Sequence, residues 1–191
     1  ALADGDRPTA EQLLQKVAAA DPDSFEARAM LAQIRADQGD LAGALKAYEA
    51  LATRYPHSAA ARTAAGLILQ AAGRSADART WYEDAIKVDP KEGVAAVHLA
   101  SLYVADETTL TSAIRLAQKA VELLPDDADA HDTLGRAYLK SGRPEVAVRE
   151  FEQAVSLDAG ENSYREHLAT AKKKAADLIA AQPEMLSKVS R

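Results

Sequence analysis

The chain has 191 residues, of which 48% are hydrophobic but only 5% aromatic, and its formal net charge is −6 at pH 7. Such an acidic chain offers no basic field to attract nucleic acid or an anionic membrane surface. The absence of cysteine excludes disulfides and thiolate zinc sites. No apolar run approaches the roughly 20 residues that span a bilayer, so we expect no direct membrane insertion.

The first predicted element is an amphipathic helix over residues 9–20, after a polar start at residues 1–8. In the frame of the sequence that follows, this helix corresponds to the second helix of a repeat. Residues 9–24 are therefore interpreted as a half repeat or an N-terminal helix, and we expect the array to begin inside a longer one.

Four prolines then recur at intervals of 34, 34 and 35 residues: Pro22, Pro56, Pro90 and Pro125. A fixed period of this length indicates a repeat architecture. Each proline removes a backbone donor and is expected to end a helix. The predicted repeats cover residues 25–58, 59–92, 93–127 and 128–161.

The residue pattern of each repeat predicts a pair of helices separated by a tight turn. Three repeats have glycine at the fifteenth position, where a left-handed backbone ends the first helix: Gly39, Gly73 and Gly142. A small eighth residue and an alanine at the twentieth position are expected to let the paired backbones approach closely. These positions hold Ala32, Gly66, Ala100 and Gly135, then Ala44, Ala78, Ala113 and Ala147. Aromatic residues occupy the twenty-fourth position in three repeats, as Tyr48, Tyr82 and Phe151.

With these residues the chain resembles the tetratricopeptide repeat proteins. The resemblance implies an all-α fold, a right-handed α-solenoid of helix-turn-helix repeats closed by a C-terminal capping helix. That helix is expected over residues 162–181, with a frayed tail over 182–191. Repeat three departs from the pattern, because Glu107 replaces the glycine and Ala117 the aromatic, so we expect a longer turn there.

Sequence motifs for chemistry are sparse. His98, His131 and His167 fall near one place on successive first helices, but none has the local spacing of a metal site, so packing or surface roles are preferred. The acidic residues that open the fourth repeat are read mainly as helix N-terminal charge rather than as a cation site. They are Asp126, Asp127, Asp129 and Asp132. No nucleophile elbow or phosphate loop is present, so we expect no enzyme activity, no cofactor and no metal.

The resemblance implies that the first helices line a concave groove that holds a peptide, a helix or a partner protein. The groove residues expected to bind the partner are Thr63, Leu67, Gln70, Val94, Val97, Ser101, Val104, Asp132, Arg136 and Leu139. The middle of this set is apolar, which favours a hydrophobic partner segment over Leu67, Val94, Val97 and Val104.

Two known binding modes of the family fit poorly. Chaperone-binding members hold a terminal carboxylate with Lys and Asn, whereas the matching positions here are Ala29, Gln33, Ala64, Val94 and His98. Members linked to glycosyltransferases carry an asparagine ladder, whereas this chain has the single Asn162.

The leading hypothesis is a non-catalytic scaffold that binds a protein or peptide partner. Residues 117–122 and 131–135 resemble closing repeats of bacterial envelope proteins, some associated with exopolysaccharide export, which favours a periplasmic or envelope location over a cytoplasmic one. The alternatives are a self-associating homo-oligomeric array, or the repeat region of a larger polysaccharide-export protein or enzyme.

Overall fold

The computed structural model describes residues 7–189, with side chains at residues 10–106 and 108–181. The chain divides into two compact units, Ala1–Ala95 and Ala96–Arg191, and each is described separately. Every regular element within residues 7–189 is helical. No helix in this part of the chain is long and apolar enough to cross a membrane.

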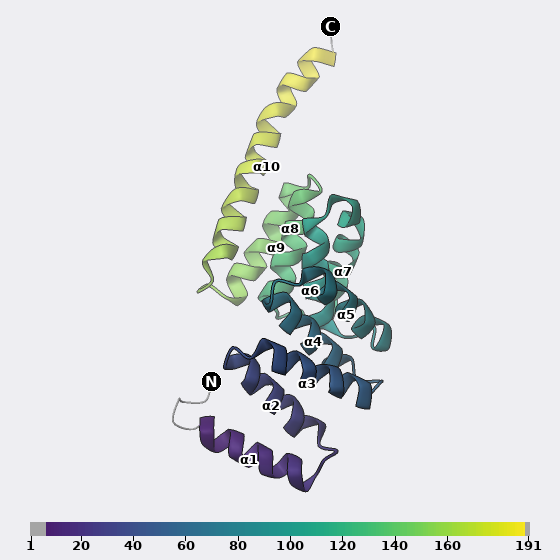
Figure 1. Cartoon of the computed structure of the whole chain (residues 1–191). Coiled ribbons are helices and arrows are strands. Elements are labelled where there is room, and N and C mark those ends of the chain that lie inside the picture. The colour runs from purple at the N-terminus through teal and green to yellow at the C-terminus, as the bar shows by residue number, and fades with distance from the viewer. Residues whose placement is uncertain (1–6, 190–191) are drawn as a thin grey trace. The chain divides into compact units, whose positions relative to one another are not determined.

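The first unit is built from helices that follow one another through short turns, as the purple-to-blue part of Figure 1 shows. They are α1 (Arg7–Ala20), α2 (Phe25–Asp37), α3 (Leu41–Arg54), α4 (Ala59–Ala71) and α5 (Ser75–Val88). Two helix pairs, α2 with α3 and α4 with α5, occupy the predicted repeats 25–58 and 59–92. The next helix, α6 (Gly93–Ala105), contains the boundary between the two units.

The second unit starts within α6 and ends with a long helix. Its further elements are the 3₁₀ turn η1 (Glu107–Thr109), α7 (Leu110–Leu123), α8 (Ala128–Lys140), α9 (Pro144–Leu157) and α10 (Asn162–Val189). The 3₁₀ turn is the longer connection predicted for repeat three. The tail prediction is wrong, because α10 continues to Val189 instead of ending at residue 181. Glu, Met, Leu and Lys favour helix there, and Pro183 removes one backbone donor without ending it.

Local chemistry explains most helix boundaries. Ser24 and Ser58 begin α2 and α4 by accepting hydrogen bonds from backbone N–H groups three residues later, at 3.3 and 3.2 Å. Asp127 caps α8 in the same way, with the Ala130 N–H at 2.8 Å from its carboxylate. The three turn glycines have φ angles of 75° to 86°, a region that other residues enter only with strain.

Paired helices pack through the predicted small and aromatic positions. The alanines at the twentieth position, Ala44, Ala78, Ala113 and Ala147, are fully buried. A Cβ atom on Gly66 would lie 2.5 Å from the Tyr82 ring, and one on Gly135 would lie 2.7 Å from the Phe151 ring. Both rings are fully buried, so each glycine provides the space that an aromatic residue of the partner helix fills.

Candidate functional site

In the first unit, the predicted binding residues differ in their exposure. Thr63 is buried, and its hydroxyl donates a hydrogen bond to the Ala59 carbonyl one turn earlier. Leu67 and Gln70 are half-buried, and the Gln70 side-chain oxygen accepts a 2.9 Å hydrogen bond from the Tyr82 hydroxyl. Val94 is the most open member, with 39% of its surface exposed.

In the second unit, the predicted apolar residues belong to the core. Val97 is 5% exposed and Val104 is 6% exposed. Val104 packs with Ala113 and Ala137 in one hydrophobic cluster. These two valines therefore stabilise the helix packing and present almost no area to a partner, while Leu139 is half-buried.

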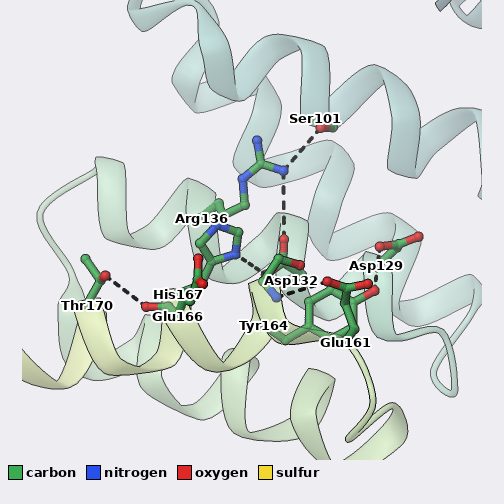
Figure 2. A network of polar contacts seen from close by, with 10 residues as sticks. Ser101, Asp129, Asp132, Arg136, Glu161, Tyr164, Glu166, His167 and Thr170 are labelled. Carbon is green, nitrogen blue, oxygen red and sulfur yellow. Dashed lines mark hydrogen bonds and ion pairs between the residues drawn. The ribbon is translucent and has the colours of Figure 1, made fainter. Parts of the chain in front are cut away.

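Three of the predicted residues meet in a polar contact network in the second unit (Figure 2). Arg136 Nη1 donates a 3.3 Å hydrogen bond to Ser101 Oγ and lies 3.8 Å from Asp132 Oδ2. His167 Nδ1, from α10, donates to Asp132 Oδ1 at 2.7 Å. The carboxylate of Asp132 thus joins α8 to α10, and Arg136 joins α8 to α6.

A second carboxylate extends this network along the same helices. The Tyr164 hydroxyl of α10 donates a 2.6 Å hydrogen bond to Asp129 Oδ1 of α8. Figure 2 shows Asp129 and Tyr164 beside Asp132. We name the six residues Ser101, Asp129, Asp132, Arg136, Tyr164 and His167 the polar wall.

The contacts of the polar wall follow a simple rule of spacing. Ser101 and Arg136, Asp129 and Tyr164, and Asp132 and His167 are each 35 residues apart. Lys140 also reaches back about one repeat, because its ammonium group donates to the carbonyl oxygens of Val104 and Ala105, 36 and 35 residues earlier, at 2.7 and 3.0 Å. Residues one repeat apart occupy equivalent places on neighbouring first helices, so their side chains meet.

Burial dominates the electrostatics of the polar wall. Asp132 is 5% exposed, and this burial raises its pKa above the ordinary value, although the contacts with His167 and Arg136 favour the carboxylate. Burial also raises the pKa of Tyr164, and the hydrogen bond to Asp129 adds to the effect. His98, on α6, has a pKa lowered by burial, which the charges of Asp129 and Asp127 partly oppose.

The histidines do not come together as a ligand set. Both ring nitrogens of His131 make contacts, Nδ1 with Glu150 Oε2 at 2.9 Å and Nε2 with the Pro125 carbonyl at 3.0 Å. His167 is held by Asp132 instead. Among the side chains that the structure describes, no three His, Cys, Asp or Glu residues are grouped so that they could hold a metal ion.

The predicted groove residues include Ser101, Asp132 and Arg136 but not His167 or Tyr164, and His167 was interpreted as a packing or surface residue. Both lie on α10, which the sequence assigns to a capping role. A signal was present, because continuing the repeat frame past residue 161 puts these two side chains one repeat after Asp132 and Asp129. The acidic residues at the start of α8 divide between roles, since Asp127 caps the helix and Asp129 and Asp132 bond to α10.

The comparisons with known proteins agree with this architecture. Yeast Tom70 superposes with a TM-score of 0.79 at 17% identity, covering 98% of this chain and 40% of that chain. MamA from Desulfovibrio magneticus RS-1 superposes with a TM-score of 0.66 at 21% identity, covering 100% and 96%. At these identities the likeness shows the fold, and it confirms the predicted all-α solenoid class.

Sequence comparison adds one curated relative and the family itself. The Hsp70-Hsp90 organizing protein of Triticum aestivum is 34% identical over 109 residues, which are 55% of this chain and 18% of that protein. This chain thus spans less than a fifth of the relative's length. One tetratricopeptide repeat family matches residues 1–59, 30–93 and 63–128, and a second matches residues 104–172. The chain belongs to the tetratricopeptide repeat family.

Proposed function

We propose that this chain is a non-catalytic scaffold that binds a protein or peptide partner along its first helices, with the polar wall as the contact region in the second unit. The observation that carries the proposal is the buried carboxylate of Asp132, which His167 contacts at 2.7 Å and Arg136 at 3.8 Å. A buried carboxylate adds little net stability to a fold even when it is paired, which favours a functional role for this one.

The contacts of the wall prepare it for recognition of polar groups. Arg136 and His167 are oriented by their hydrogen bonds before any partner arrives, which lowers the entropy lost on binding. Asp129, Lys140 and Glu166 are exposed, so charges of both signs are available to a partner. In this unit the wall therefore favours a partner segment with charged side chains over the apolar segment expected from Val97 and Val104.

The contacts of Ser101 support a binding role over a catalytic one. A serine nucleophile needs a neighbouring base, as in a Ser-His-Asp triad. Ser101 Oγ instead accepts a hydrogen bond from Arg136, while Asp132 holds His167. Serine, histidine and aspartate are all present, but the histidine is bonded to the aspartate and the serine to an arginine, so no base activates the serine.

Matched charge substitutions test the proposal. Arg136→Gln with Glu166→Gln removes one positive and one negative charge from the region of the wall, and Arg149→Gln with Glu145→Gln removes the same charges from α9. We expect the wall variant to lose a partner identified by cross-linking and mass spectrometry, with at least tenfold weaker binding of the purified partner, while the α9 variant keeps it. Equal binding by both variants would refute the wall as the contact region.

We further propose a bacterial envelope or export assembly as the setting. The support is the sequence resemblance of residues 117–122 and 131–135 to envelope-associated repeat proteins. The proposal predicts that the native protein fractionates with the envelope of its cell. Recovery in the cytoplasmic fraction alone would contradict it.

Self-association is a second candidate function, favoured by exposed apolar residues. Leu13 and Val17 on α1 are 56% and 48% exposed, and Leu178 and Ile179 on α10 are also exposed. Contiguous exposed apolar residues often mark contact sites. Sedimentation equilibrium over a range of concentrations tests this candidate, because a mass that stays monomeric contradicts it.

A further inference from the structure

A pocket in the first unit combines an apolar floor with positive charge. It has a volume of about 520 Å³ and is lined by α1, α2 and α3. The floor consists of alanine and leucine side chains, namely Ala18, Leu31, Ala32, Ala47, Ala50 and Leu51. Its remaining lining residues are the four cations Arg28, Arg35, Lys46 and Arg54, and none of the lining residues is acidic. In a chain with a net charge of −6, this local excess of positive charge is unusual.

The helix geometry places the cations at the two ends of the pocket. Because α2 and α3 run antiparallel through a tight turn, Arg28 near the start of α2 lies at the same end as Arg54 at the end of α3. Arg35 and Lys46 lie at the opposite end, nearer the turn. The helical rise separates the two ends by roughly 10 to 12 Å.

At one end of the pocket, the cations already contact carboxylate and carbonyl oxygens of the chain itself. Arg54 forms an ion pair with Asp23, and the Arg28 Nε donates a 2.8 Å hydrogen bond to the Pro22 carbonyl. At the other end, the exposed side chains of Arg35 and Lys46 make no hydrogen bond or ion pair with any residue that the structure describes. The unpaired end is therefore the one open to an external anion.

We propose that this pocket docks an acidic amphipathic helix of a partner protein, at a site separate from the polar wall. One of its carboxylates would pair with Arg35 and Lys46. A second, two turns away, would take the place of the Asp23 carboxylate and the Pro22 carbonyl beside Arg54 and Arg28. Two carboxylates seven residues apart on a helix are separated by about 10 Å, which matches the distance between the ends of the pocket. Apolar side chains between them would fill the floor, since about 520 Å³ accommodates a few side chains but not a helix backbone.

Charge reversal with a defined peptide tests the site. The probe is a fluorescein-labelled, alanine-based helical peptide with two Glu residues seven apart and two Leu residues between them. We expect saturable binding by fluorescence anisotropy that weakens as salt rises. Arg35→Glu with Lys46→Glu should weaken it at least tenfold, and replacing the peptide's Glu residues by Lys should restore binding to that variant.

Two control variants separate local charge from global charge and from the polar wall. Arg115→Glu with Arg149→Glu changes the net charge equally but lies on α7 and α9, and Arg136→Gln lies on the wall. Both should bind the peptide as the unmodified chain does, and far-UV circular dichroism checks that all variants fold. Ala50→Trp, which fills the floor, should also prevent binding.

Three results would overturn the proposal. The first is the absence of saturable binding up to about 1 mM peptide. The second is an equal loss of peptide affinity in the control and pocket charge-reversal variants. The third is displacement of the peptide by octanoate at equal concentration. The last result would identify a site for small organic anions. Loss of the wall partner has no bearing on these outcomes, so the two proposals fail independently.

Discussion

Adding one methyl group to Gly135 should destabilise the protein, although alanine is the better helix former. The gain in helix propensity from Gly135→Ala is about 0.8 to 1 kcal/mol. The added Cβ, however, would lie 2.7 and 2.8 Å from two carbon atoms of the Phe151 ring, whereas ordinary contact begins at 3.4 Å. The ring is fully buried and must move by roughly 0.7 Å within a close-packed core.

Overpacking costs about 1 to 3 kcal/mol, and three contacts under 3.0 Å with a fully buried ring place this substitution in the upper part of that range, at about 2 to 3 kcal/mol. The free energy of unfolding should therefore fall by about 1 to 2 kcal/mol after the propensity gain is subtracted. Urea unfolding followed by far-UV circular dichroism measures this difference. The double variant Gly135→Ala with Phe151→Leu removes the colliding ring atoms. We therefore expect it to be at least as stable as Phe151→Leu alone, which is a strong departure from additivity.

A neutral or stabilising effect of Gly135→Ala would refute the assigned role of this glycine. Strict additivity in the double variant would do so as well, because it would mean that residues 135 and 151 do not contact one another. Gly66→Ala offers an independent repetition against Tyr82, where the added Cβ would lie 2.5 Å from the ring.

Substitutions at two further positions probe the polar wall and a turn. Burial raises the pKa of Asp132, so its protonated form is favoured by folding, and its contribution to stability is lost as pH rises through that raised value. Asp132→Asn should therefore be no less stable than the unmodified chain at neutral pH, and its free energy of unfolding should fall less as pH rises through the acidic range. Urea titrations at several pH values measure both effects. A variant that is less stable than the unmodified chain at neutral pH would show that the carboxylate is net stabilising. Gly73→Ala should lower the free energy of unfolding by about 1 to 2 kcal/mol through its φ of 75° alone, because nothing lies within 4 Å of the added atom. Gly73→Asn should lose less, and an equal loss in both variants would indicate a cause other than the backbone.

Much of the fold was predictable from the sequence, because its determinants are local. Proline and glycine act on their own backbone, and Ser24 caps a helix with a group three residues away. The period of 34 or 35 residues then gives the order of the helices. The prediction was wrong for the last helix after residue 181, because the helix preference of its residues continues past Pro183.

The candidate site was predictable only in part. Ser101, Asp132 and Arg136 were assigned to one face from their positions in the repeat, and the structure brings them together. The exposure of Val97 and Val104 was not predictable in this way. Burial depends on how closely neighbouring helices approach, and an average repeat frame does not specify that distance.

The sequence by itself determines that this protein is an array of tetratricopeptide helix pairs, since regular prolines, turn glycines and small residues are sufficient to specify it. Only the tertiary structure decides which side chains meet. The pairing of Asp132 with His167 requires α8 and α10 to lie side by side, and the basic pocket requires α2 and α3 to bring four cations together without any periodic signal. The physical reason is that helix formation depends on neighbours along the chain, whereas charge pairing and burial depend on neighbours in space.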